Sequence, residues 1–372
     1  MRIGVPKEIK NREYRVGLTP AAARELVARG HEVIVETKAG DTIGLSDEMY
    51  VRAGARIFST AAELFGAADM IVKVKEPQPV EIKRLKKGQT LFTYLHLAPD
   101  PEQTRGLLES GAIAIAYETV TDSRGGLPLL APMSEVAGRM SIQAGAHSLE
   151  IAQGGRGMLL GGVPGVAAAK VVILGGGVVG TNAARMAMGL EAHVTILDVS
   201  LHRLNELDLA FGAMLNTIYS TIDSIEEHVV AADLVIGGVL LPGAAAPKLI
   251  TEKMVKQMKK GSVIVDVAID QGGCAETSHA TTHDAPTYLV HDVVHYCVAN
   301  MPGGVARTST FALNNATLPF TLALAELGPE QAMRKNPHLR AGLNVYKNTL
   351  TYKAVAEAQN LPFKSAEDVL EL

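Results

Sequence analysis

The chain has 372 residues, which is more than one compact core usually holds and suits two domains. Hydrophobic residues make up 47% and charged residues 20%, a composition typical of ordered globular proteins that excludes a disordered chain. The formal net charge of −4 gives no electrostatic reason to expect nucleic acid or an anionic membrane as a partner.

The N-terminal stretch MRIGVPKEIKNREYR lacks an apolar run followed by a cleavage site, so we expect no signal peptide. The longest apolar stretches are interrupted by Lys170 and Asp233, and neither reaches the roughly 20 apolar residues that span a bilayer. Cys274 and Cys297 could pair, but two free thiols in a reducing compartment are the simpler interpretation. We therefore expect a cytoplasmic protein.

Strand-like and helix-like segments alternate through the first part of the chain. Thr19 and Pro20 begin a predicted helix, and Gly30 ends it. Strands separated by helices favour a parallel sheet covered on both faces. The predicted strands are 2–8, 31–37, 69–75, 90–96 and 112–120, and the predicted helices are 19–30, 60–68 and 100–111.

A long helix over 132–152 leads into a second unit with the same alternation, so its sheet should also be parallel. The predicted strands of this unit include 231–239, 261–270 and 286–294. After about residue 307 the pattern is helical, over 308–327 and 340–359, and these helices should return to the first domain. The expected fold is α/β, with two doubly wound parallel-sheet (Rossmann-like) domains and an interdomain cleft. The expected limits are 1–130 plus 307–372 for a discontinuous first domain and 131–306 for the second domain.

The clearest motif is a glycine-rich turn between a predicted strand and a predicted helix. In VVILGGGVVG, the residues Gly175, Gly177 and Gly180 fit the pattern G-x-G-x-x-G. Glycines at this spacing permit a tight turn, close approach of the backbone to a pyrophosphate, and close packing of helix on strand. The helix N-terminus offers N–H groups and a partial positive charge to the phosphates. Because the next strand, HVTILD, ends at Asp198, we expect a dinucleotide site here.

Asp198 bears on which dinucleotide binds. Its carboxylate can accept hydrogen bonds from ribose hydroxyls, whereas a 2′-phosphate about 4 Å away would be repelled by roughly 4 kcal/mol at an effective dielectric of 20. Arg203 follows nearby and could soften this repulsion, so the sequence favours NAD over NADP without excluding NADP. Asp198 could also serve as the N-cap of the next helix.

Polar side chains follow several predicted strands, at the edge where open parallel sheets bind ligands. Strand 69–75 ends with Lys73 and Lys75, whose side chains share a face, and strand 90–96 ends with His96. An Arg and a Lys suit a substrate carboxylate, and a His with an Asp suits proton transfer beside a nicotinamide. The other polar residues at predicted strand ends are Lys7, Glu8, Arg12, Arg15, Asp270 and Asn300.

Each of these residues also has a purely structural interpretation. Lysines at strand ends are usually solvated, and Arg15 could be a surface charge. Asp270 could be a turn residue before QGG. His96 could be a core histidine with a satisfied hydrogen bond, which its position alone favours. The residues taken as a group favour catalysis.

Six motifs cover nearly the whole chain and follow one another in a fixed order: MRIGVPKEIKNREYRVGLTP, VKVKEP, TYLHLA, LGGGVVG, VDVAIDQGG and NMPGGVARTST. In this order they resemble the alanine dehydrogenase family, which also includes the NAD(H)-binding part of the proton-translocating transhydrogenase. The resemblance implies NAD-dependent, reversible oxidative deamination of L-alanine to pyruvate and ammonium, and a homo-hexamer. It also implies that 1–130 plus 307–372 form the substrate domain and 131–306 the NAD-binding domain.

The resemblance also implies roles for individual residues. Arg15 and Lys75 would hold the substrate carboxylate, and His96 and Asp270 would form the acid–base pair at the reacting carbon. Besides Gly175 and Gly180 of the glycine motif, the implied cofactor contacts are Ser134, Gly177, Val178, Val179, Asp198, Arg203, Ser220, Val239, Leu240, Val267, Ala268, Ile269, Asp270, Val298, Ala299, Asn300 and Met301.

One position departs from the pattern of the family. Some relatives have an arginine near position 279 that helps to bind the nucleotide, and this chain has His279, which puts that one contact in doubt. His279 and His283 are four residues apart in a polar, turn-like stretch, so we expect no metal site.

Two other functions remain open at this point. An NAD(H)-binding subunit of a transhydrogenase would need no substrate pocket, so Lys75, His96 and Asp270 together argue against it. A 2-hydroxy-acid dehydrogenase would share the two-domain fold, but its chemistry would need no ammonia.

Overall fold

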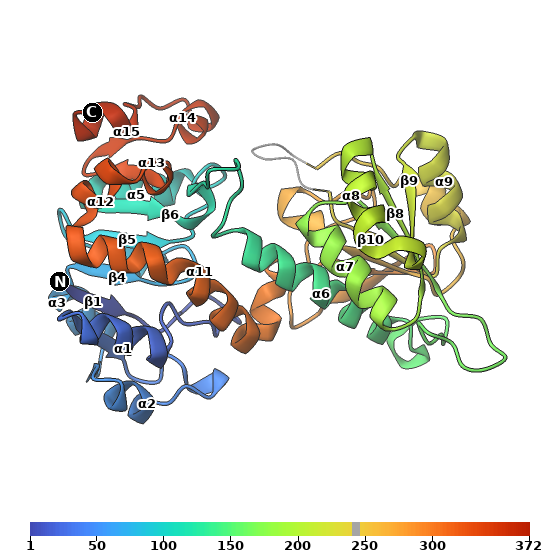
Figure 1. The fold of residues 1–372 in the computed structure, drawn as a ribbon, viewed down its shortest axis with the longest axis horizontal. Helices are drawn as coiled ribbons and strands as arrows, with labels where there is room; N and C mark the ends of the chain where they lie inside the picture. The colour runs from blue at the N-terminus through green and yellow to red at the C-terminus, as the bar shows by residue number, and fades with distance from the viewer. Residues whose placement is uncertain (240–245) are drawn as a thin grey trace. The chain divides into compact units, whose positions relative to one another are not determined.

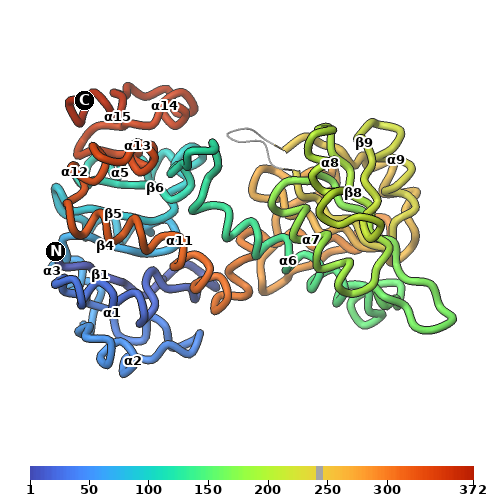
Figure 2. Tube along the Cα trace, in the orientation of Figure 1, coloured from blue at the N-terminus to red at the C-terminus, as the bar shows by residue number. Residues whose placement is uncertain are grey.

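The computed structural model describes residues 1–239 and 246–372. The described chain forms two compact units, which are labelled by element in Figure 1. Unit 1 comprises Met1–Met133 and Ala306–Leu372, and unit 2 comprises Ser134–Val305. Both chain termini therefore belong to unit 1, as the trace in Figure 2 shows.

Unit 1 is built on an eight-stranded sheet with the order β15-β14-β6-β5-β4-β1-β2-β3. The strands from β1 to β6 run parallel, whereas β14 and β15 are antiparallel additions at the β6 edge. The strands are β1 (Arg2–Val5), β2 (Glu32–Glu36), β3 (Arg56–Phe58), β4 (Met70–Val72), β5 (Thr90–Thr93), β6 (Ile113–Ala116), β14 (Leu343–Tyr346) and β15 (Thr349–Leu350).

Helices cover the sheet of unit 1, and those from α11 to α15 come from the C-terminal segment of the chain. Helix α11 lies beside α1 (Figure 1), and Thr19, the N-cap of α1, donates hydrogen bonds to Asn314 of α11. Leu64 of α3 and Leu107 of α5 pack with strand residues in a buried apolar core. The helices are α1 (Pro20–Ala28), α2 (Asp47–Arg52), α3 (Ala61–Ala67), α4 (Pro79–Ile82), α5 (Pro101–Ser110), α11 (Ala306–Leu327), α12 (Pro329–Lys335), α13 (Pro337–Arg340), α14 (Lys353–Gln359) and α15 (Ala366–Leu370).

Unit 2 is built on a seven-stranded sheet with the order β12-β13-β11-β10-β7-β8-β9. All neighbours pair in parallel except β12, which is antiparallel to β13 at one edge. The two mostly parallel sheets confirm the expected α/β class. The strands are β7 (Lys170–Leu174), β8 (His193–Asp198), β9 (Leu215–Tyr219), β10 (Leu234–Gly237), β11 (Val263–Asp266), β12 (Thr287–Val290) and β13 (Val293–Tyr296).

Two buried apolar cores lie in unit 2. One core joins α6, α7 and α8 to the sheet through residues such as Ile142, Ala184 and Leu207. The other joins α9 and α10 to the sheet through residues such as Val229 and Val255. The helices are α6 (Ala131–Ser148), which begins in unit 1, α7 (Val178–Gly189), α8 (Leu201–Phe211), α9 (Ile222–Ala231) and α10 (Glu252–Gln257).

The C-terminal segment differs from its prediction as a helix over 340–359. Residues 343–346 form β14, which pairs with β6, and only residues 353–359 are helical, as α14. Leu343 and Val345 are buried on the sheet, at 1% and 0% exposure. The apolar residues of this short stretch fit both the helical and the strand periodicity. Pairing with the distant strand β6 decides in favour of a strand.

The segment 286–294, predicted as one strand, is instead part of a hairpin. Strands β12 and β13 are joined at His291 and Asp292, which both have a positive φ, of 50° and 61°. Such a two-residue turn usually carries Asn-Gly or Asp-Gly, so the sequence His-Asp gave no turn signal.

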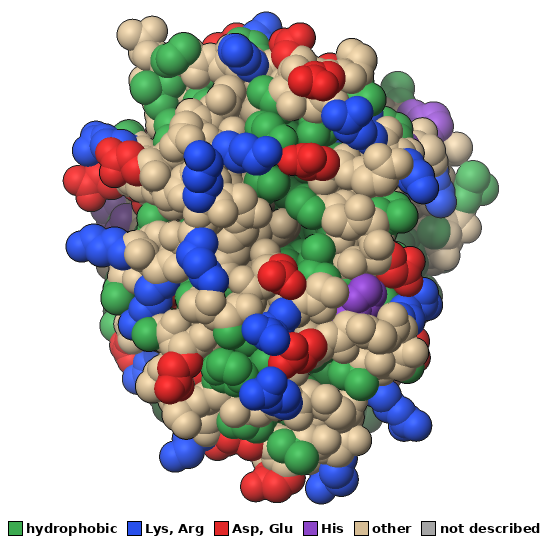
Figure 3. Space-filling view, turned by 90° about the vertical axis from the view of Figure 1, so that its left-hand side faces the viewer, with side chains coloured by type: hydrophobic (Ala, Val, Ile, Leu, Met, Phe, Trp, Pro, Cys, Tyr) green, Lys and Arg blue, Asp and Glu red, His purple; other side chains and the backbone are tan. Residues whose placement is uncertain are grey.

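The surface shown in Figure 3 belongs to unit 1 and carries Lys and Arg side chains interspersed with Asp and Glu. Neither sign of charge forms one continuous area on this face, in keeping with the small net charge of the chain. Among the residues that the structure describes, no helix combines the length and hydropathy that crossing a bilayer requires. Cys274 and Cys297 are both buried free thiols, so their pairing in a disulfide is wrong.

The position of β14 in the core of unit 1 predicts the effect of one substitution. Val345 is wholly buried in a cluster that includes Leu91 and Ala114. Val345→Asp should therefore destabilise unit 1 by about 4 kcal/mol or more, because an unpaired carboxylate would be buried. Urea unfolding followed by circular dichroism measures this loss.

The matched control is Ala354→Asp, an exposed position in the first turn of α14, where an acidic residue is tolerated. If Val345→Asp unfolded at the same urea concentration as this control, β14 would not be part of the core.

Candidate active site

The three glycines of the motif lie between β7 and α7 and have different surroundings. Gly175 has a φ of +97°, and a Cβ there would lie 3.1 Å from the backbone of Gly238. A Cβ on Gly180 would lie 1.8 Å from the carbonyl oxygen of Gly175, so only glycine lets the helix pack this closely. A Cβ on Gly177, the N-cap of α7, would meet nothing within 4 Å. This loop is tight at two glycines and open at the third, as a pyrophosphate cradle requires.

Asp198 holds this glycine loop in place from the end of β8. Its Oδ2 accepts a hydrogen bond from the Gly176 N–H at 2.7 Å, and its Oδ1 accepts one from the Ser200 N–H at 2.8 Å. Each carboxylate oxygen has a second lone pair, which leaves capacity for ribose hydroxyls. The N-cap of α8 is Ser200, so the alternative reading of Asp198 as that N-cap is wrong.

Arg203, on the first turn of α8, braces the same loop. Its Nε donates to the carbonyl oxygen of Gly176 at 2.7 Å, and its Nη2 donates to Thr181 Oγ1 at 2.7 Å. Its Nη1 pairs with Glu206. The guanidinium is thus bound to the loop and to a carboxylate on its own helix.

The other predicted cofactor residues of unit 2 follow the carboxyl ends of neighbouring strands. The Ser220 N–H donates to the Asp198 carbonyl oxygen at 3.0 Å, and Val239 lies against Gly175. Residues 267–270 form a 3-10 turn directly after β11, and Asp270 there is exposed. Residues 298–301 follow β13. Ser134 is different, because it lies on α6 and not after a strand. Leu240 falls outside the described residues.

His279, the position that departs from the family pattern, packs within unit 2. Its ring stacks on the ring of Tyr288, with centroids 3.7 Å apart, and its backbone N–H donates to the Tyr288 hydroxyl. His283 lies beside the carbonyl oxygen of Asn300, with Nε2 at 3.1 Å. Over the part of the chain that the structure describes, no three His, Cys, Asp or Glu residues form a group suited to a metal ion.

In unit 1, Lys73 follows β4 and is completely buried, which contradicts the expectation of a solvated lysine. Its Nζ lies 2.8 Å from Glu8 and 3.5 Å from Glu81, and it also donates to the carbonyl oxygen of Lys75. Burial alone would lower the pKa of Lys73, but the charges of Glu8 and Glu81 outweigh it and raise the pKa above its ordinary value. The ammonium group therefore stays charged at neutral pH.

Lys75 is partly buried, and neighbouring residues fix both its backbone and its side chain. Its N–H donates to Glu8 at 3.2 Å, its carbonyl oxygen accepts from Thr93, and its Nζ lies 3.2 Å from Glu76. Burial raises the pKa of Glu76, but Lys75 and Lys10 outweigh burial and lower it to about 2. Glu76 is thus ionised at neutral pH.

Arg15 is buried at 2% exposure, so its interpretation as a surface charge is wrong. Its Nε and Nη2 donate to the two carboxylate oxygens of Glu13 at 2.7 and 2.6 Å, and its Nη1 points at Met133 Sδ. Burial opposes the charge of Arg15, yet the hydrogen bond and charge of Glu13 raise its pKa overall. The result is a fixed guanidinium at the carboxyl edge of the sheet.

His96 lies in a turn beyond β5, which ends at Thr93 instead of the predicted residue 96. Its side chain is 45% exposed, so its interpretation as a core histidine is wrong. Its φ is +49°, a left-handed conformation that costs a non-glycine residue about 1–2 kcal/mol. The ring stacks on Tyr94, with planes 8° apart and centroids 5.7 Å apart.

The sequence did not single out Glu13, Tyr94 or Glu118, although each lies beside a predicted site residue. Tyr94 donates to the Leu129 carbonyl oxygen and anchors the stack with His96. Glu118 follows β6 and accepts the backbone N–H of His96. The predicted strand AIAIAYETV (112–120) contains Glu118, so the search for polar residues after strand ends passed over it; in the structure β6 ends at Ala116.

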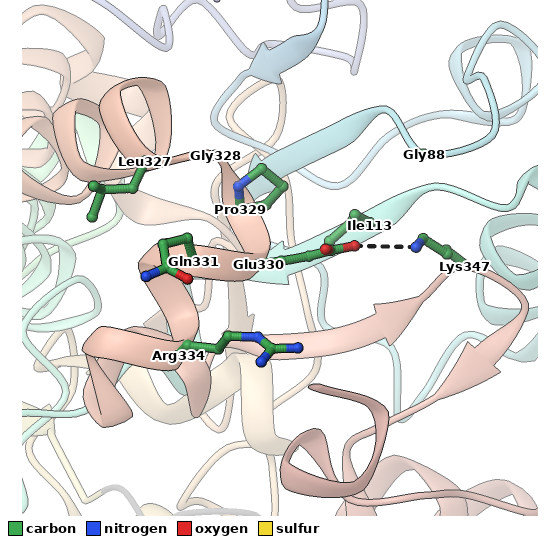
Figure 4. A pocket seen from close by; sticks show the side chains of 9 residues that line it. All are labelled: Gly88, Ile113, Leu327, Gly328, Pro329, Glu330, Gln331, Arg334 and Lys347. Atoms are coloured by element: carbon green, nitrogen blue, oxygen red, sulfur yellow. Dashed lines mark hydrogen bonds and ion pairs between the residues drawn. The ribbon is translucent and has the colours of Figure 1, made fainter. Parts of the chain in front are cut away.

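A separate pocket of about 560 Å³ lies in unit 1, as Figure 4 shows. Gly88 precedes β5 and Ile113 begins β6, so the pocket lies at the amino ends of these strands, opposite His96. Glu330 in its wall is already paired with Lys347 at 3.1 Å. Because ligands of open parallel sheets bind at the carboxyl ends, the candidate active site is the edge that carries Lys75 and His96.

Comparison with known proteins places the chain among characterised relatives over its full length. The family "Alanine dehydrogenase/PNT" matches through its N-terminal domain at residues 4–137 and its C-terminal domain at residues 141–353. A curated alanine dehydrogenase from Halomonas elongata is 62% identical over 370 residues, covering 100% of both chains.

Two solved structures are similar to the chain. A structure of L-alanine dehydrogenase has a TM-score of 0.94 at 54% identity and covers 97% of this chain and 99% of its own. A transhydrogenase from Sinorhizobium meliloti has a TM-score of 0.84 at 25% identity and covers 94% and 100%.

The close contact at Gly180 predicts a specific loss of nucleotide binding. Gly180→Ala forces a methyl group against the Gly175 carbonyl oxygen and should open the loop, weakening NADH binding by about tenfold or more, roughly the effect of 1.4 kcal/mol. Fluorescence titration with NADH measures the affinity, and circular dichroism reports the fold.

Gly189→Ala is the matched control, since Gly189 lies on the same helix and a Cβ there meets nothing within 4 Å. Equal NADH affinities for the two variants would rule out the glycine loop as the phosphate site.

Proposed function

Because the chain belongs to the alanine dehydrogenase/PNT family, we propose that it catalyses the reversible oxidative deamination of L-alanine with NAD. In the forward direction, L-alanine, NAD⁺ and water give pyruvate, ammonium, NADH and a proton. The observation that carries the proposal is the 62% identity to a curated alanine dehydrogenase over the whole of both chains. The family recognised in the sequence is thereby confirmed, as is the enzyme class, an oxidoreductase acting on an amino acid.

NAD⁺, when bound, accepts the hydride that leaves the α-carbon of the substrate. Members of this family use NAD, and the residues of unit 2 fit a dinucleotide. The glycine loop and the N-terminus of α7 would hold the pyrophosphate, and Asp198 would accept hydrogen bonds from the ribose hydroxyls. We propose that unit 2 is the NAD-binding domain and unit 1 the substrate domain.

Arg15 and Lys75 would hold the substrate carboxylate. Both are cations fixed by neighbouring carboxylates, Arg15 by Glu13 and Lys75 by Glu76, so a substrate carboxylate would share them with these partners. Cations fixed in advance cost little reorganisation when the substrate binds. Such positioning presents the α-carbon for loss of hydride.

His96 would carry the protons that the later steps move. After hydride leaves, water adds to the imine carbon, and the resulting carbinolamine loses ammonia to give pyruvate. An imidazole can exchange protons at neutral pH in both directions, and His96 is exposed enough to meet a substrate. Asp270 would be its acid–base partner, a role that rests on the resemblance to the family.

We further propose a homo-hexamer that works in the cytoplasm, as the family resemblance implies. Support for association comes from the segment 151–166 of unit 2, where large apolar side chains are exposed. Ile151 is 73%, Leu159 68% and Val166 63% exposed. Exposed apolar groups that cluster in this way are typical of protein–protein contacts. Light scattering coupled to gel filtration would measure the number of subunits.

One assay tests the proposed reaction against its rivals. NADH should form with L-alanine, and NADH should be consumed with pyruvate only when ammonium is present. Pyruvate reduction without ammonium would instead indicate a 2-hydroxy-acid dehydrogenase. Absence of turnover in either direction, with NADH still bound, would indicate a binding subunit like that of a transhydrogenase.

Replacement of His96 tests the proposed proton carrier. His96→Ala should lower turnover with L-alanine by roughly 10²-fold or more, the usual effect of losing a general acid–base group. NADH affinity should stay within about twofold, because His96 lies in unit 1 and the glycine loop in unit 2.

The control for this prediction is His147→Ala, an exposed histidine on α6 that pairs only with Glu150 among the described contacts. Wild-type turnover in His96→Ala would assign the proton transfer to another group.

A further inference from the structure

The side chain of Glu118 reaches back to the turn that carries His96. Glu118 follows β6, the neighbour of β5 in the sheet, and lies 22 positions after His96 in the sequence. Its Oε1 accepts the His96 N–H at 2.6 Å, and both of its oxygens lie 3.2 Å from the Leu95 nitrogen, whose N–H donates to them. The carboxylate thus takes up two consecutive backbone donors where the strand has ended.

The same carboxylate also faces the imidazole. Glu118 Oε1 lies 3.9 Å from His96 Nδ1, within the range of an ion pair when the ring is protonated. Glu118 itself is largely shielded, with 14% of its side chain exposed, whereas His96 is 45% exposed. A shielded carboxylate beside a more exposed imidazole acts on the ring in both orientation and charge.

We infer that Glu118 is a positioning residue for His96: its carboxylate holds the left-handed turn that presents the ring and lies beside the ring itself. This inference rests on the proposed function, in which His96 carries protons. Because Nδ1 is the nitrogen nearer to Glu118, Nε2 is the nitrogen that exchanges protons with the substrate.

Two tyrosines near Glu118 are neutral at neutral pH. Tyr94 stacks on His96, and burial raises its pKa, with the charge of Glu118 adding to the effect. Tyr352 precedes α14. Burial raises its pKa, and the charge of Glu118 adds a smaller effect in the same direction. Arg15 acts on Tyr94 with the opposite sign. Glu118, by contrast, is a carboxylate that contacts both the turn and the ring of His96.

Two variants separate the two effects of Glu118. Glu118→Gln keeps an oxygen that can accept the backbone N–H groups but removes the charge, whereas Glu118→Ala removes both. Glu118→Gln should lower kcat with L-alanine by about tenfold and leave KM within about twofold, because the substrate-binding cations are untouched. Glu118→Ala should lower kcat further and also lower the melting temperature.

Rescue by the conservative variant gives a readout that a merely structural role would not move. Because the glutamine oxygen can still accept the N–H groups of Leu95 and His96, Glu118→Gln should retain part of the kcat that Glu118→Ala loses. Glu330→Gln is the matched control, since Glu330 is also a hydrogen-bonded carboxylate of unit 1 but lines the pocket at the opposite edge.

A double-mutant cycle decides whether Glu118 acts through His96. In the His96→Ala background, Glu118→Gln should cause no further loss of kcat. An equal loss in both backgrounds would overturn the inference.

A measurement without turnover keeps this test independent of the reaction. Proton NMR follows the imidazole of His96, assigned by its absence in His96→Ala, and its chemical shifts should change in Glu118→Ala but not in the control Glu330→Gln. If the wild type failed to oxidise L-alanine, the proposed function would fall, and these chemical shifts would still support or overturn the contact between Glu118 and His96.

Discussion

Lys73 lies wholly buried after β4, with its ammonium nitrogen 2.8 Å from Glu8 and 3.5 Å from Glu81. A buried charge left without its partner costs about 3–5 kcal/mol, so these three groups are constrained to remain together. Glu8 also accepts the N–H groups of Val74 and Lys75, which ties the segment after β1 to the segment after β4. The position of Lys75 therefore depends on charges that are buried beneath it in unit 1.

The same arrangement recurs along the carboxyl edges of both sheets: a carboxylate after one strand holds the segment after its neighbour. Glu118 after β6 holds the turn of His96 after β5, and Asp198 after β8 holds the glycine loop after β7. At this edge the strands end and backbone N–H groups lose their ladder partners. A carboxylate satisfies these donors and adds a negative charge beside them. The candidate site is thus assembled from cross-strand contacts that also complete the fold.

Much of this could be predicted because the relevant patterns are local. The alternation of strands and helices, the N-cap at Thr19 and the glycine motif each depend on neighbouring residues, and each is present in the structure. The predictions failed where a distant partner decides the structure. Residues 343–346 form a strand because β6 lies beside them, and the partner of Glu118 lies 22 positions away. A local sequence pattern of a few residues cannot contain both partners of these contacts.

The turn at His96 shows why a candidate site is hard to predict from local rules. Histidine has no intrinsic preference for the left-handed region strong enough to end a strand, so the pattern of TLFTYLH extends the predicted strand to residue 96. In the structure the strand stops at Thr93, and hydrogen bonds to charged Glu118, each worth about 1.5–3 kcal/mol, can offset the strain of the turn. Asn300, among the predicted cofactor contacts, is left-handed as well, with a φ of +62°. Strain at such residues persists only where tertiary contacts hold it, which is why local propensity fails where the chemistry is expected.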